Sequence, residues 1–106
     1  MRSDDDLPTL LSEHLEVALD ELSRASGLTV EEIVELVEYG VFEPSGGEQR
    51  SGWRFSARTI TVGRRASRLK SDFDLNASGL ALALTYVERI EALEAEIRRL
   101  RCELLG

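Results

Sequence analysis

Two short helical patterns joined by a glycine-containing turn occupy residues 20–43, and they constrain the fold more than any other stretch. The first pattern ends at Gly27, a residue type that commonly terminates helices. Thr29 is a good N-cap for a second helix over residues 30–39, and Gly40 follows that helix as its terminator. Two helices around such a turn predict a helix-turn-helix unit.

The second helix of this unit has an acidic outer face. Glu31, Glu35 and Glu38 are four and three residues apart, so they share one side of the helix, with Glu32 beside them and completing a capping box. A helix-turn-helix unit normally places this helix in the major groove of DNA, where carboxylates repel phosphate. The face therefore argues against reading DNA and leaves two interpretations open: a cationic protein partner, or a charged surface that only keeps the chain soluble. The opposite side carries the residues expected in the core: Ile33, Leu36 and Val37.

Length and composition limit the class of protein. The 106 residues suit one domain, and no apolar run approaches the roughly 20 residues that cross a bilayer. The acidic start lacks a signal-peptide pattern, so we expect a cytoplasmic protein. Cys102 and His14 are each the only residue of their type, which argues against disulfide, metal and histidine- or cysteine-based catalytic sites. We expect no cofactor, no metal and no enzymatic activity.

The net charge of −7 conceals a segregated pattern. Residues 1–49 contain 13 acidic and 2 basic side chains, whereas residues 50–71 contain seven basic and no acidic ones. Residues 72–106 contain 7 acidic and 4 basic side chains. Two interpretations stay open: contact with a charged partner, or neutralisation of one block by another within the fold or across a dimer.

The N-terminal quarter allows more than one assignment. We expect the acidic residues 1–13 to be disordered. Residues 9–25 fit a continuous helix with leucines along one stripe. They also fit a short strand over residues 14–18, followed by a helix with Asp20 as its N-cap. Periodicity leaves both open.

The middle of the chain predicts a hairpin and a third helix. Residues 41–43 are expected to pair with residues 53–55 around a Gly- and Ser-rich tip, as the wing of a winged helix-turn-helix. We expect Trp53 and Phe55 to fill the core rather than stack on a ligand. A third helix is predicted with Ser56 as its N-cap and its end near residue 70. It is basic and fits either phosphate contacts or docking to the acidic block; its charged residues are Arg58, Arg64, Arg65, Arg68 and Lys70.

The last helix is predicted over residues 77–105, with Asn76 as its N-cap. Leu80, Leu82 and Leu84 near its start indicate burial on several sides. Further on, isoleucine and leucine alternate at spacings of three and four, which predicts a coiled-coil seam and a homodimer. Parallel pairing opposes Arg and Glu at the flanking positions, while antiparallel and intramolecular packing remain open. The seam residues are Ile90, Leu93, Ile97, Leu100 and Leu104.

The order of these elements resembles MerR-type proteins and, more closely, the chaperone modulator CbpM family. The resemblance covers about residues 17–105 and includes a strand before Asp20, which we adopt. An Asn-x-x-Gly pattern at residues 76–79 also occurs in MerR-like heat-shock repressors, which bind DNA. The matching stretches are residues 21–32, 35–44, 53–55, 65–69 and 74–84, followed by a leucine-rich tail.

The resemblance implies a mainly α-helical, MerR-like winged helix-turn-helix domain over residues 14–75, with a small β wing. A long C-terminal dimerisation helix follows over residues 76–106. It also implies a non-catalytic regulator that binds the J-domain of a DnaJ-like co-chaperone, CbpA, and blocks its work with DnaK.

J-domains engage DnaK through a basic helix, so an acidic surface of this chain can take that helix in DnaK's place. The candidate contacts are Glu31, Glu32, Glu35 and Glu38, with Asp72 and Asp74 as second candidates. The alternative is a DNA-binding regulator that contacts phosphates through Arg50, Arg54 and Arg58.

Overall fold

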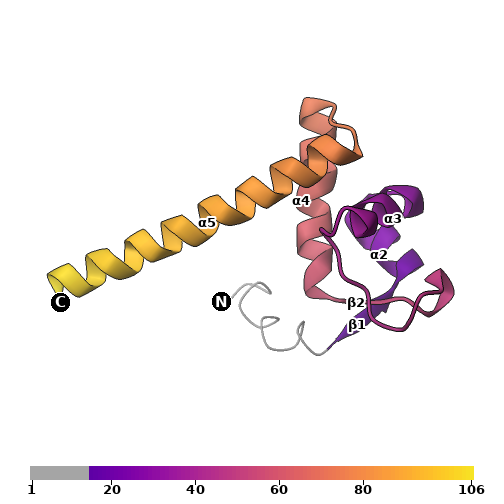
Figure 1. Cartoon of the computed structure of the whole chain (residues 1–106), viewed down its shortest axis with the longest axis horizontal. Helices are drawn as coiled ribbons and strands as arrows, with labels where there is room; N and C mark the ends of the chain where they lie inside the picture. The colour runs from indigo at the N-terminus through magenta and orange to yellow at the C-terminus, as the bar shows by residue number, and fades with distance from the viewer. Residues whose placement is uncertain (1–14) are drawn as a thin grey trace, which may run out of the picture.

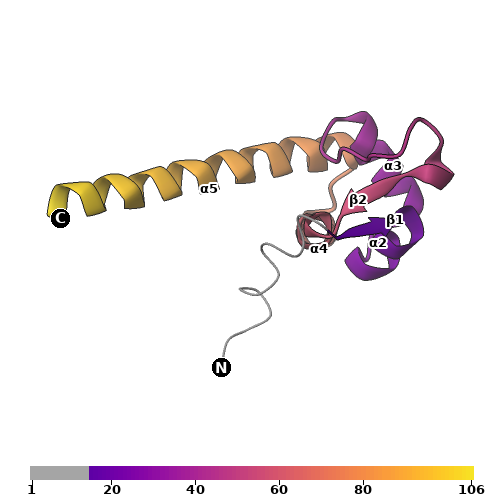
Figure 2. The same ribbon diagram turned by 90° about the horizontal axis from the view of Figure 1, so that it is seen from below.

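The structure is a computed structural model that describes residues 15–106, and it consists of a small head and a long helical arm (Figure 1). The head contains the helix-turn-helix and a two-stranded sheet, and the arm is a single helix that projects away from it (Figure 2). The elements are β1 (Glu16–Ala18), α2 (Leu19–Ser26), α3 (Val30–Glu38), a 3-10 turn (Arg50–Gly52), β2 (Arg54–Ser56), α4 (Arg58–Phe73) and α5 (Ala77–Leu105).

The predicted mainly α-helical fold with a small sheet and a long last helix is confirmed. The prediction that residues 1–13 are disordered lies outside the described residues. Within residues 15–106, every helix is too short or too polar to cross a membrane.

The helix-turn-helix forms where the local signals place it. Gly27 adopts a left-handed φ of 90° and its amide donates to the Ser23 carbonyl oxygen at 3.0 Å, which ends α2. The Thr29 hydroxyl accepts from the Glu32 amide at 3.1 Å, and the Glu32 carboxylate accepts from the Thr29 amide at 2.9 Å. This reciprocal box fixes the start of α3. Gly40, with φ 81°, follows its end.

The strand preceding the first helix is confirmed, but the N-cap prediction is wrong. Ala18 ends β1 and caps α2, so Asp20 lies inside the first turn of the helix. The Glu21 carboxylate accepts from the Ala18 amide at 2.8 Å and supplies the capping bond. The strand conformation of Ala18 already provides the extended backbone that an N-cap requires, so no polar residue is needed there.

The predicted hairpin between residues 41–43 and 53–55 is also wrong. Strand β2 pairs antiparallel with β1, in a register that places Phe55 opposite Val17. The amide of Val41 instead donates to the Leu36 carbonyl at the end of α3, at 2.9 Å, which keeps this segment close to the helix and out of a ladder. One isolated bridge, between Ser45 and Arg54, joins the loop to β2.

The core lies between α2, α3, α4, β2 and the first turns of α5. Phe55 is 1% exposed, and its ring meets Phe42 and Trp53 edge to face at centroid distances of 6.4 and 6.1 Å. The expectation that Trp53 and Phe55 pack in the core is therefore confirmed. On α3, the buried apolar residues are Ile33, Val34 and Leu36, while Val37 is half-buried.

Helix α4 crosses α2 at a glycine. A Cβ atom on Gly63 would lie 2.8 Å from the Cβ of Ser26, so the close approach of the two helices requires a glycine at this position. The predicted N-cap at Ser56 is wrong, because α4 begins at Arg58 with Ala57 as its N-cap. The helix continues to Phe73, beyond the predicted end at Lys70. The Asn76 side chain then accepts from the Gly79 amide at 2.8 Å, which confirms its predicted role as N-cap of α5.

Candidate protein-interaction surfaces

The outer side of α3 presents three exposed carboxylates, which we call the three-glutamate face: Glu31, Glu35 and Glu38. Among residues 15–106, no ion pair or side-chain hydrogen bond involves any of them. Tyr39, 56% exposed, follows Glu35 by four residues and adds an aromatic ring beside the carboxylates. The face therefore offers negative charge and one flat apolar surface to a partner.

Glu32 is different from its three neighbours. Its backbone amide and one carboxylate oxygen form the capping box with Thr29, and its other carboxylate oxygen pairs with the Lys70 ammonium of α4. Its side chain is only 20% exposed. Glu32 thus joins the start of α3 to the last turns of α4, at the edge of the three-glutamate face.

The second candidates, Asp72 and Asp74, are exposed at the end of α4. Asp72 lines a hollow between α4 and α5 with Arg65, Arg68 and Val87. Asp74 has a left-handed backbone, with φ 53°, and forms the C-cap of α4. The hollow that Asp72 lines contains no α3 residue, so Asp72 and the three-glutamate face do not share one cavity.

The basic block is partly neutralised within the chain. Lys70 pairs with Glu32, and Arg65 pairs with Glu91 of α5 at 2.9 Å. The Arg64 guanidinium donates to the Ala25 carbonyl oxygen at 3.0 Å, which fixes α4 against α2. Neutralisation by acidic residues of the same chain therefore accounts for part of the basic block over residues 50–71.

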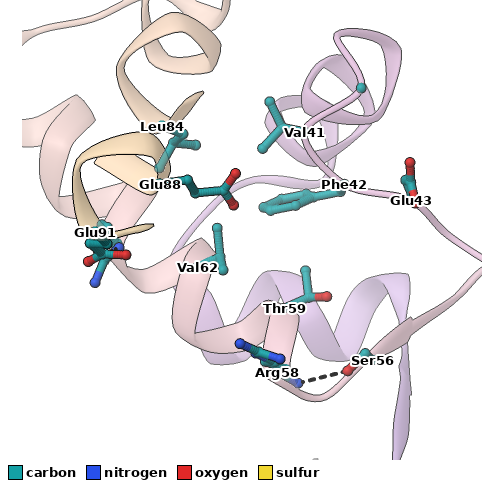
Figure 3. A pocket seen from close by; sticks show the side chains of 12 residues that line it. Val41, Phe42, Glu43, Ser56, Arg58, Thr59, Val62, Leu84, Glu88 and Glu91 are labelled. Atoms are coloured by element: carbon teal, nitrogen blue, oxygen red, sulfur yellow. Dashed lines mark hydrogen bonds and ion pairs between the residues drawn. The ribbon is translucent and has the colours of Figure 1, made fainter. Parts of the chain in front are cut away.

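A hollow of about 560 Å³ lies between the segment after α3, the start of α4 and the middle of α5 (Figure 3). Figure 3 shows the Glu88 side chain pointing from α5 toward the ring of Phe42. Arginines and glutamates both line it, and its lining contains no histidine or cysteine. Within residues 15–106, no group of three or more potential ligands is arranged to hold a metal ion.

Helix α5 carries most of its large exposed apolar residues along one side, spaced three or four apart. All the predicted seam residues are exposed; the exposed fraction is lowest at Leu93, 42%, and highest at Leu104, 87%. Leu82 and Tyr86, 58% and 60% exposed, extend the seam toward the head, whereas Leu80 and Leu84 are buried. The expectation of burial at Leu82 is therefore wrong. We call the complete set the apolar stripe: Leu82, Tyr86, Ile90, Leu93, Ile97, Leu100 and Leu104.

Comparison with known proteins identifies the family. Residues 17–102 match the family described as MerR HTH family regulatory protein. The "Chaperone modulatory protein CbpM" of Coxiella burnetii (strain Dugway 5J108-111) is 37% identical over 82 residues, which cover 77% of this chain and 76% of that protein. The chain belongs to the CbpM family.

Other CbpM proteins support this membership. That of Pseudomonas putida (strain W619) is 33% identical over 96 residues, covering 89% of this chain and 94% of the relative. That of Salmonella arizonae is 38% identical over 79 residues, covering 74% and 77%. The resemblance to CbpM and to MerR-like proteins is thus confirmed, and these relatives bear the name of regulators of chaperones.

Sequence reasoning missed two features of these surfaces. The side-chain position of Glu32 depends on Lys70, which is distant in sequence, although the capping box itself was a visible local signal. The start of the apolar stripe was visible in the spacing of four between Leu82, Tyr86 and Ile90. The neighbouring leucines at 80 and 84 obscured it, because all three predicted the same buried cluster.

Proposed function

We propose that this chain is a non-catalytic chaperone modulator that binds the J-domain of a DnaJ-like co-chaperone of the CbpA type. The three-glutamate face contacts the basic helix of the J-domain. Because J-domains use that helix to engage DnaK, occupation of the helix inhibits the co-chaperone. The names of the related proteins support the chaperone-modulating role.

The observation that carries the proposal is the contrast among the four glutamates of α3. Glu32 is committed to the capping box and to Lys70, whereas Glu31, Glu35 and Glu38 are exposed and have no ion-pair partner among residues 15–106. Like charges one turn apart, as at Glu31 and Glu35, destabilise an isolated helix by about 0.2–0.5 kcal/mol per pair. A basic partner relieves this repulsion and is steered toward the face.

Asp74 and Asp72 remain second candidates within the proposal. Both are exposed and acidic. Asp74 is close in sequence to Leu75 and Asn76, which line a hollow together with Glu32 and Glu35, so it is the better placed of the two. Asp72 belongs to the α4–α5 side and contributes through the general negative field of the chain.

The chain also forms a homodimer through the apolar stripe. Seven large apolar side chains, each at least 42% exposed, follow one side of α5 at the three-and-four spacing of a coiled coil. Monomeric soluble proteins rarely expose contiguous apolar surface of this extent. In a parallel pair, Arg89 opposes Glu94 of the partner subunit, and Glu96 opposes Arg101 of the partner subunit.

Isothermal titration with the isolated J-domain of the co-chaperone tests the main proposal. The double variant Glu31→Lys plus Glu35→Lys is expected to weaken binding by roughly tenfold or more, because it replaces attraction by repulsion at two contacts. The matched control is Glu43→Lys plus Glu48→Lys, which changes net charge equally on exposed residues outside the face. Equal affinity for both double variants would refute the assignment of the face.

A gel shift separates this function from the DNA-binding alternative. DNA binding through α3 would place the three carboxylates against phosphates and bases and would forgo the release of counterions. We expect no sequence-specific band even at low salt. A tight, specific band that depends on Arg50 and Arg54 would instead favour the transcriptional regulator.

A further inference from the structure

A third hollow, of about 240 Å³, borders the three-glutamate face. We call it the α3–α5 hollow, because α3, the end of α4 and the start of α5 form its walls. Much of the wall is apolar, from Leu36, Leu75, Ala77 and Leu80. Its remaining lining residues are polar or charged: Glu32, Glu35, Lys70 and Asn76.

The α3–α5 hollow and the three-glutamate face are continuous. Glu35 belongs to both, since it is exposed on the outer side of α3 and also lines the hollow. A helix lying along Glu31 and Glu35 therefore passes beside the opening. The start of α5 packs against α3 (Figure 1), and residues of both helices line the hollow.

The walls of the hollow are held by interactions within the chain. The ion pair between Lys70 and Glu32 joins α4 to α3 at its edge. The Asn76 side chain is fixed by its bond from the Gly79 amide at 2.8 Å. Leu36 and Leu80 are 0% and 2% exposed, so the apolar floor belongs to the core. A cavity with fixed walls costs little reorganisation when a partner enters.

We propose that the α3–α5 hollow takes one bulky apolar side chain of the J-domain's basic helix, from a position three or four residues away from a lysine or arginine that contacts Glu31 or Glu35. This inference rests on the proposed function. Residues at those spacings share one side of a helix, so one partner helix can satisfy both sites. The carboxylates attract basic helices in general, and the hollow selects those that also carry the apolar residue.

The larger hollow of Figure 3 does not offer this combination. Arginines and glutamates line it together, and the pair between Arg65 and Glu91 occupies one side of it. Its lining contains no residue of the three-glutamate face. Charge therefore does not favour one class of partner there, whereas the α3–α5 hollow adjoins a face of one sign.

Filling the hollow tests the proposal. Ala77, the first residue of α5, is half-buried in the wall, and Ala77→Phe is expected to occupy the space that the partner's side chain needs. Isothermal titration with the isolated J-domain should show about tenfold weaker binding, the change that corresponds to about 1.4 kcal/mol. The matched control is Ala95→Phe, at an exposed position of α5 outside the hollow and the apolar stripe. Circular dichroism verifies that both variants keep their helical content.

Substitutions in the J-domain give a second measurement. Each bulky apolar residue of its basic helix is changed to alanine in turn and titrated against the wild-type chain and Ala77→Phe. One substitution is expected to weaken binding to the wild-type chain by about tenfold and to have little further effect on Ala77→Phe, as coupled sites do. Fully additive effects at every position would overturn the proposal.

The outcomes distinguish the hollow from the face. If the wild-type chain binds the J-domain and Ala77→Phe binds equally well, the hollow is not a contact, while the proposed function stands. If Ala77→Phe weakens binding but the double charge reversal does not, the hollow is retained and the carboxylate assignment fails. Absence of any binding by the wild-type chain would overturn both.

Discussion

Helix α3 buries one side in the head and α5 buries one side of its first turns, but the chemistry of their exposed sides is opposite. The exposed side of α3 carries Glu31, Glu35 and Glu38, and that of α5 carries the apolar stripe. Apolar surface on a long helix stabilises permanent association, while exposed charge mainly sets rate and selectivity of encounter. The chain thus separates a proposed self-association surface from a proposed partner-binding surface.

The two helices also differ in what supports them. Helix α3 is short, begins with a reciprocal capping box, and is held to α4 by the pair between Glu32 and Lys70. Beyond its first turns, α5 lies outside the head, and among residues 15–106 the ion pairs at its end are intrahelical, from Arg99 to Glu96 and to Glu103. Isolated helices gain little stability in water, so the outer part of α5 needs a packing partner that α3 already has.

The largest expected effect follows from placing charge in the apolar stripe. Leu93→Asp plus Ile97→Asp introduces two carboxylates at adjacent seam positions, whose burial in a dimer costs several kcal/mol. We expect a monomer in sedimentation-velocity experiments at concentrations where the wild-type chain is a dimer. The variant Ala92→Asp plus Ala95→Asp adds the same charge on exposed positions outside the stripe and should remain dimeric. A wild-type chain that is itself monomeric would remove the proposed role of the stripe.

The next effect separates the two surfaces by salt. In the proposed complex, each carboxylate of the three-glutamate face forms one exposed ion pair with the J-domain. Three such pairs at about 0.5 kcal/mol each amount to roughly a tenfold change in affinity, and salt screens them strongly as its concentration rises toward 1 M. We expect J-domain binding to weaken by about that factor between low and high salt, as measured by titration. Dimerisation through apolar residues should persist or strengthen over the same range. Parallel loss of both would show that the two surfaces do not differ as proposed.

The features that were predictable from the sequence are those encoded by neighbouring residues. The capping box of Thr29 and the Asn76 cap each depend on residues three positions apart, so one short window contains the whole signal. The exposure of Glu31 and Glu35 likewise follows from helical periodicity and the apolar residues between them. The fold class and the location of the acidic face were accessible for this reason.

The features that were missed depend on contacts between distant segments. Strand β2 pairs with β1, so Phe55 lies opposite Val17 and not opposite the segment after α3, which is nearer in sequence. No local sequence pattern predicts this pairing. Glycine is a poor helix former, and the reason for Gly63 inside α4 is its close approach to Ser26 of α2, which is distant in sequence. The α3–α5 hollow arises where three helices meet, so its lining could not be predicted from any one of them.

A smaller effect is expected from the cap of α3. Thr29→Ala removes the hydroxyl that accepts from the Glu32 amide, and loss of an N-cap of this kind costs about 1 kcal/mol. Thermal and urea unfolding should show this decrease in the free energy of unfolding. Thr29→Ser keeps the acceptor and serves as the control. J-domain affinity at temperatures where both variants are folded should change less than for the double charge reversal, since the carboxylates of the face are retained.

The smallest effect concerns the ion pair at the edge of the face. Lys70→Met keeps the aliphatic stem of the side chain but removes its charge, and a pair with side chains 45% and 20% exposed contributes no more than about 1 kcal/mol. Urea unfolding should therefore detect a loss of a few tenths of a kcal/mol. The variant also leaves Glu32 without its cation, which adds a fourth uncompensated carboxylate beside Glu31 and Glu35. We expect J-domain binding to tighten slightly at low salt, and unchanged or weaker binding would indicate that Lys70 serves the partner site by holding the wall of the hollow.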